Sequence, residues 1–71
     1  MKYEKHELLK LDIYLKSKFP KCGFKTVTCL DFYVTYVIIK NIKHSLTWTE
    51  LDYNKIQFDI YKIIMEAVLW Q

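Results

Sequence analysis

The chain has 71 residues, of which 52% are hydrophobic and 17% are aromatic, and its net charge at pH 7 is +3. This length allows one small domain over residues 1–71, near the lower size limit for a stable core. The modest net charge argues against a protein that binds nucleic acid mainly by electrostatic attraction. So small a chain cannot easily bury this much apolar surface, so the excess predicts an interface with a second copy or with another protein.

The basic residues are all lysines, eleven in number. The absence of arginine weakens sequence-specific DNA reading, which depends on arginine forks to guanine. The usage of Lys, Ile, Tyr and Asn is typical of AT-rich genomes, such as those of low-GC bacteria and their phages. Residues 1–25 hold seven lysines and three acids, whereas residues 26–71 hold four lysines and five acids. The basic N-terminal part is either a solvated helix surface or a surface for an acidic partner.

The first predicted element covers residues 4–19. Its apolar residues alternate at strand spacing, but they also form a helical stripe, and the Leu, Lys and Glu content favours a helix. The helical stripe consists of Leu8, Leu11, Leu15 and Phe19. Pro20 is expected to end the helix, because the residue before a proline avoids the helical region. Pro20 and Gly23 mark the loop that follows.

Residues 24–41 are the longest run of strand-forming residues in the chain. One unbroken strand would far exceed the usual length, so we expect a bend near Cys29-Leu30-Asp31 that divides the run into two strands. Even-numbered and odd-numbered residues of the second strand point to opposite faces. We expect one face to meet the core and the apolar far end to be covered on both faces. A helix is the alternative, because Leu30, Val34, Val37 and Ile38 share a helical face.

Residues 41–45 are interpreted as a break that lacks Gly and Pro, so no two-residue hairpin turn is predicted there. Residues 46–51 alternate, which predicts a short strand; a first helical turn capped by Ser45 is the alternative. The final helix is capped by Asp52 or Asn54 and is expected to run to about Leu69.

The final helix carries two apolar stripes, although a surface helix needs only one. Its polar stripe is Lys55, Asp59, Lys62 and Glu66. The first apolar stripe is Ile56, Ile60, Ile63, Ile64 and Ala67. The second apolar stripe is Phe58, Tyr61, Met65 and Leu69. Together the elements predict an α+β domain, α-β-β-(β)-α, in which an antiparallel sheet of two to three strands is covered by an N-terminal and a C-terminal helix.

No motif for catalysis, metal or cofactor binding stands out. Cys22 and Cys29 are separated by six residues and lack the close ligand pairs of a zinc site, and His6 and His44 do not supply them. We interpret Cys29 as a small buried residue of a strand and Cys22 as a loop residue. Asp31 is better explained by the bend than by acid or base chemistry. We therefore expect no enzyme, no metal site and no cofactor.

The N-terminus runs directly into a charged segment, without the apolar region of a signal peptide. No apolar run approaches the ~18 residues of a membrane span. We therefore expect a cytoplasmic protein with reduced thiols and no membrane partner, located in the host cytoplasm if a phage encodes it.

These features favour a non-catalytic module that binds another protein, in the manner of a small inhibitor that a phage or mobile element directs at a host protein. The second apolar stripe of the final helix is the predicted interface, most simply that of a twofold homodimer. In the alternative, the N-terminal helix folds over this stripe and completes a monomeric core.

The rival hypothesis is a nucleic-acid-binding protein. Aromatic residues on an open sheet face would stack on bases, and N-terminal lysines would contact phosphates. The aromatic candidates are Tyr33, Tyr36 and Trp48, and the lysine candidates are Lys10, Lys16, Lys18, Lys21 and Lys25.

Overall fold

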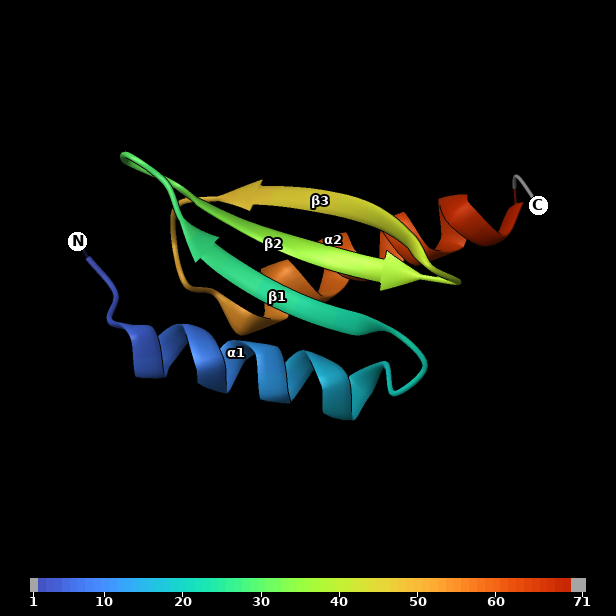
Figure 1. Cartoon of the computed structure of the whole chain (residues 1–71), viewed down its shortest axis with the longest axis horizontal. Coiled ribbons are helices and arrows are strands. Elements are labelled where there is room, and N and C mark those ends of the chain that lie inside the picture. The colour runs from blue at the N-terminus through green and yellow to red at the C-terminus, as the bar shows by residue number, and fades with distance from the viewer. Residues whose placement is uncertain (1, 70–71) are drawn as a thin grey trace.

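The computed structural model describes residues 2–69 and has an α+β fold with the element order α-β-β-β-α. Helix α1 (Lys5–Lys18) precedes the sheet and helix α2 (Tyr53–Leu69) follows it (Figure 1). The strands are β1 (Gly23–Thr28), β2 (Tyr33–Ile39) and β3 (Ile42–Trp48). The predicted architecture is confirmed, with three strands in the sheet.

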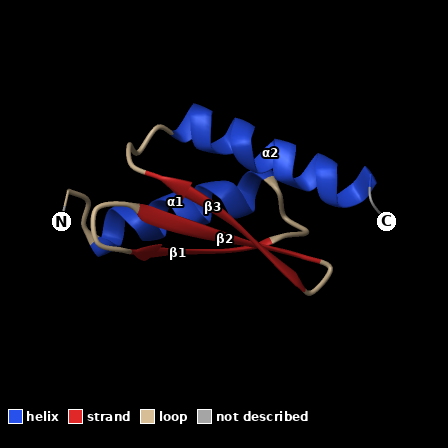
Figure 2. Cartoon of the chain, turned by 90° about the horizontal axis from the view of Figure 1, so that it is seen from above, coloured by secondary structure: helices blue, strands red, loops and turns tan. Residues whose placement is uncertain are grey.

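The strands form one antiparallel sheet in the order β1-β2-β3, with β2 in the centre. Both helices lie on the same side of this sheet: α1 runs along β1, and α2 packs on β2 and β3 (Figure 2). We call the side that carries the helices the core face and the other side the open face. This arrangement leaves the open face without a helix from any part of residues 2–69.

Burial alternates along β2, as expected for a strand with only one covered face. The odd-numbered residues from Tyr33 to Ile39 are buried on the core face, whereas Val34, Tyr36 and Ile38 are half-buried on the open face. The expectation that the far end is covered on both faces is therefore wrong, because both helices lie on the side away from Ile38. The predicted bend is confirmed: residues 29–32 form the loop between β1 and β2, and Asp31 is exposed there.

Helix α1 uses the predicted leucine stripe. Leu8, Leu11 and Leu15 are buried, and Phe19 is half-buried just beyond the last turn, where its N–H donates to the Leu15 carbonyl at 2.8 Å. Pro20 follows directly, so the predicted helix end is confirmed. The stripe points to the sheet because residues three and four apart share one side of a helix.

The connection between β2 and β3 differs from the prediction. A two-residue turn, Lys40-Asn41, joins the strands, in place of the break expected over residues 41–45. Lys40 and Asn41 have φ values of 50° and 69°, as in the type I′ turn that suits a twisted hairpin. This turn usually contains glycine, and its absence concealed the hairpin. Strand β3 consequently starts at Ile42, earlier than the strand predicted over residues 46–51.

A chain of hydrogen bonds crosses the core face and joins α1 to all three strands. Trp48 Nε1 donates to Thr35 Oγ1 at 2.8 Å, and the hydroxyls of Thr35 and Thr26 are 2.8 Å apart. Thr26 Oγ1 donates to Asp12 Oδ1 at 2.6 Å, and the Thr26 N–H donates to Asp12 Oδ2 at 3.1 Å. Because Thr26 gives its one hydroxyl hydrogen to the carboxylate, Thr35 must donate to Thr26. We call this series the Asp12–Trp48 chain.

The segment before α1 is tied to the far end of the sheet through Tyr3. The Tyr3 N–H donates to the Tyr33 hydroxyl at 2.9 Å, and the Tyr3 hydroxyl accepts the Leu51 N–H at 3.0 Å. The Tyr3 ring lies 5.5 Å from the Tyr33 ring and 6.0 Å from the Trp48 ring, between centroids. These contacts close the core where β3 leads into α2.

The prediction of Cys22 as a loop residue is confirmed, whereas the prediction of Cys29 as a buried strand residue is wrong. Cys22 lies in the loop before β1 but is buried in the core, and Cys29 is half-buried in the loop after β1 instead of inside a strand. Burial raises the pKa of the Cys22 thiol, and the nearby Lys16 charge opposes this shift. Lys16 Nζ reaches this loop by donating to the carbonyls of Pro20 and Cys22, each at 2.8 Å.

The turn geometry predicts opposite effects for two substitutions of Asn41. Asn41→Gly should raise the free energy of unfolding by roughly 0.5 kcal/mol, because glycine adopts a positive φ without steric cost. Asn41→Ala should lower it by about 1 kcal/mol, because a Cβ without a polar side chain is disfavoured in the left-handed region. Urea denaturation measures both. Equal effects of the two variants would contradict the turn.

The Asp12–Trp48 chain predicts a large cost for Thr35→Val, which keeps the side-chain shape and removes the hydroxyl. Trp48 Nε1 and Thr26 Oγ1 would each lose a buried partner, so the free energy of unfolding should fall by about 1–3 kcal/mol. The matched control is Thr47→Val, at an exposed position of the same sheet. Chemical denaturation compares the two, and similar small effects would show that the chain contributes little.

Cysteine burial predicts two separate thiol reaction rates. In the native protein at pH 8, Ellman's reagent should modify Cys29 first, while Cys22 should react much more slowly because it is buried and its raised pKa lowers the thiolate fraction. Mass spectrometry of the modified peptides assigns each rate. In 6 M guanidinium chloride the two rates should converge, and a faster native reaction at Cys22 would contradict the packing of this loop.

Candidate protein interface

Helix α2 attaches to the sheet through its first apolar stripe. Ile56 and Ile60 are buried against the sheet, and Ile63 and Ala67 are half-buried further along the helix. Asp52 caps the helix, since its Oδ1 accepts the Lys55 N–H at 3.1 Å. The predicted cap and the predicted inner stripe are therefore both present.

The second apolar stripe faces away from the sheet. The exposed fractions are 57% for Phe58, 50% for Tyr61, 41% for Met65 and 74% for Leu69. Val68, 54% exposed, belongs to the same surface and was missed, although its spacing of three from Met65 and seven from Tyr61 was a readable signal. We call these five residues the outward stripe.

Helix α1 does not cover the outward stripe, so the alternative of a core completed by α1 is wrong. Helix α1 meets α2 near the start of α2, on the side between the sheet and the stripe. There the Tyr14 hydroxyl donates to Gln57 Oε1, and the Tyr14 ring lies 4.8 Å from the Tyr53 ring. Because the leucine stripe of α1 is committed to the sheet, α1 cannot also reach the far side of α2.

Charged residues occupy a single flank of the outward stripe. Lys55 and Asp59 form an i,i+4 ion pair at 3.8 Å, and Lys62 Nζ lies 4.5 Å from the centre of the Phe58 ring. Lys62 and Glu66 are exposed and lie one helical turn apart. The outward stripe is thus an apolar strip with one mixed-charge border.

The aromatic residues predicted to stack on nucleic acid are divided between the two faces of the sheet. Tyr33 and Trp48 are buried on the core face, where their rings stack with centroids 4.7 Å apart. The expectation that all three lie on one open face is wrong, because Tyr33 and Tyr36 are three residues apart in β2 and alternation places them on opposite faces. Only Tyr36 of the three is on the open face, where Lys43 Nζ lies 4.8 Å from the centre of its ring.

The candidate lysines are all exposed, but the structure does not gather them into one surface. Residues of a helix are ~100° apart, so Lys16 and Lys18 point to nearly opposite sides of α1. Lys16 binds the following loop, and Lys18 Nζ lies 5.4 Å from the centre of the Tyr14 ring. Lys25 belongs to another element, β1. The remaining candidates are Lys10 of α1 and Lys21 of the α1–β1 loop.

The histidines lie in separate places: His6 is exposed on α1, and His44 is half-buried on β3. Across residues 2–69, no three His, Cys, Asp or Glu side chains form a group that could hold a metal ion. In the same part of the chain, neither helix has the length and apolarity needed to cross a bilayer.

Comparisons of this chain with protein-family models, curated proteins and solved structures find no match.

Proposed function

We propose that this chain is a non-catalytic protein-binding module, and that the outward stripe joins two copies in a twofold dimer. The carrying observation is the set of five large apolar side chains on one exposed face of α2. Soluble monomers rarely leave so large a contiguous apolar surface in water. Phe, Tyr and Met are also enriched in the cores of protein interfaces.

A second copy suits the outward stripe because the stripe is self-complementary. In an antiparallel pair of α2 helices whose twofold axis crosses the outward stripe at the level of residue 64, Lys62 of each copy lies opposite Glu66 of the partner subunit. The apolar side chains of one helix then pack on those of the other, and the two mixed-charge borders form two intersubunit ion pairs. Isologous pairing of this kind is the commonest route to a soluble oligomer.

Protein binding accounts for the surface better than nucleic-acid binding does. Two of the three candidate stacking residues are buried, and the lysines are scattered. Affinity for nucleic acid depends on phosphate contacts made together along one surface. An inhibitor encoded by a phage or mobile element, the class favoured by composition, would act on its host protein through a surface that the dimer leaves exposed.

The dimer predicts a specific effect of Met65→Lys. Met65 lies in the middle of the outward stripe and is 41% exposed, so a lysine is accommodated in the folded monomer but places a charge in the paired state. Sedimentation equilibrium should show a dimer for the wild type and a monomer for the variant. The circular dichroism spectra of the two should match.

The matched control is Ile13→Lys, which makes the same change at a 62% exposed position of α1, outside the stripe. It should leave the dimer intact. A wild type that sediments as a monomer at high concentration, or equal dissociation by both variants, would refute the proposed dimer.

A further inference from the structure

The two edge strands of the sheet differ in whether another element covers their outer backbone groups. Helix α1 runs along β1, and Asp12 Oδ2 accepts the N–H of Thr26, which points away from β2. Strand β3 forms the opposite edge and pairs only with β2 among the described residues. It continues for seven residues in unbroken register. Of the features that normally block such an edge, residues 42–48 lack Pro, a bulge and a further paired strand, and they have one exposed lysine, Lys43.

The hairpin geometry identifies which backbone groups of β3 face outward. In a two-residue hairpin, the residues that flank the turn, here Ile39 and Ile42, form a hydrogen-bonded pair. Pairs then alternate along the strands, so Lys43, Ser45 and Thr47 direct their N–H and C=O groups away from β2. The same alternation directs the Thr26 N–H of β1 outward, where it meets Asp12 as described above. The outward groups of β3 repeat every second residue, which is the pattern that another strand recognises.

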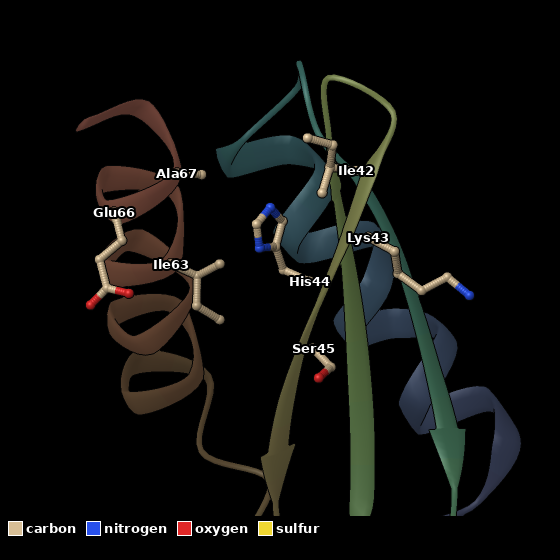
Figure 3. A pocket seen from close by; sticks show the side chains of 7 residues that line it. All are labelled: Ile42, Lys43, His44, Ser45, Ile63, Glu66 and Ala67. Carbon is tan, nitrogen blue, oxygen red and sulfur yellow. The ribbon is translucent and has the colours of Figure 1, made fainter. Parts of the chain in front are cut away.

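A groove of about 590 Å³ lies beside this edge, between β3 and the second half of α2. His44 of β3 and Ile63 of α2 face one another across it, with Ile42 and Ala67 further along (Figure 3). Ile42 is 55% exposed although it lies on the core face. The groove therefore extends the core along Ile42, Ile63 and Ala67, while Lys43, Ser45 and Glu66 add polar groups to its lining. Its volume is in the range of ligand sites.

We propose that the β3 edge and this groove bind an extended peptide segment of a partner protein, which adds a fourth strand to the sheet. The backbone of the segment would pair with Lys43, Ser45 and Thr47. Side chains alternate along a strand, so every second residue of the segment would point to the core-face side and enter the groove. The apolar part of the lining, Ile42, Ile63 and Ala67, favours apolar side chains at two such alternate positions.

This site is distinct from the outward stripe and does not depend on the proposed dimer. Ile63 and Ala67 belong to the inner side of α2, whereas the stripe lies on its far side. Of the groove residues, Glu66 is the one that also belongs to the charged border of the stripe. Peptide binding should therefore persist in the monomeric Met65→Lys variant. Loss of the dimer with retained peptide binding, or the reverse, separates the two proposals.

The first experiment selects peptides from a phage-displayed library of random eight-residue sequences, on the intact protein and on Met65→Lys in parallel. Both selections should enrich sequences with apolar residues at two alternate positions. The best peptide is then synthesised, and its affinity is measured by fluorescence anisotropy. Failure to enrich any sequence, or enrichment without the alternation, would overturn the proposal.

The second experiment tests backbone pairing by N-methylation of the synthetic peptide, one amide at a time. Methylation of the amides that face β3 should weaken binding by about tenfold or more, the size expected for one or two lost hydrogen bonds. Methylation of the intervening amides should have little effect. Uniform effects along the peptide would contradict strand addition, and this test requires no change in the protein.

The third experiment uses two variants that each introduce a phenylalanine. Ala67→Phe places a large side chain in the groove and should weaken peptide binding by about tenfold or more. Ile13→Phe enlarges a 62% exposed side chain of α1, outside both the groove and the outward stripe, and should leave the affinity within about twofold. Equal affinities for the two variants would exclude the groove as the site.

Amide hydrogen exchange supplies the final check. The outward amides of Lys43, Ser45 and Thr47 should exchange rapidly in the free protein and become protected when the selected peptide binds. Protection that grows with protein concentration in the absence of peptide would show that β3 pairs with a second copy, and would overturn the assignment to a partner peptide.

Discussion

The hydrogen bonds from Asp12 to Trp48 are the constraint on which the arrangement of this small domain depends. Thr35 is fully buried at the centre of the sheet, where a hydroxyl without partners would be costly. Its donor and acceptor are satisfied only when Thr26, Thr35 and Trp48 face the same side. A slip of one residue in register would turn Thr35 to the open face, so the chain of polar groups selects both the register and the face that the helices cover.

The same contacts explain why the molecule keeps two unused surfaces. Asp12 holds α1 at the edge of β1, and the leucine stripe of α1 packs against the sheet. Helix α2 then has only its inner side covered, because no other helix or strand within residues 2–69 reaches its far side. The sheet likewise has one protected edge and one open edge. A short chain with a large apolar fraction thus exposes the apolar surface that its core cannot bury, on α2 and beside β3.

Elements with a strong period could be predicted from the sequence, whereas features that depend on pairing could not. Helix α2 and the exposure of its second stripe follow from helical spacing, and the division into β1 and β2 follows from strand length. The Lys40-Asn41 turn was missed because it lacks glycine. Tyr33 was misplaced because it was grouped with Tyr36, although alternation along β2 puts the two on opposite faces. Trp48 shares the face of Tyr33 because the two are cross-strand partners, and this pairing could not be read from the sequence. The edge of β3 was not predicted as a peptide-binding site, because the strand was expected to begin at residue 46 and not at Ile42.

Stability and association are coupled in a domain of this size. Net folding free energies are only about 5–15 kcal/mol, and a core near the lower size limit lies toward the weaker end. A partner that binds only the folded state adds about 2.7 kcal/mol when its concentration is a hundred times Kd. The inner side of α2 packs on the core and also forms a wall of the groove. The opposite side of α2 carries the outward stripe. Occupation of either surface would therefore hold α2 in place, and with it the buried Ile56 and Ile60 on which the core depends.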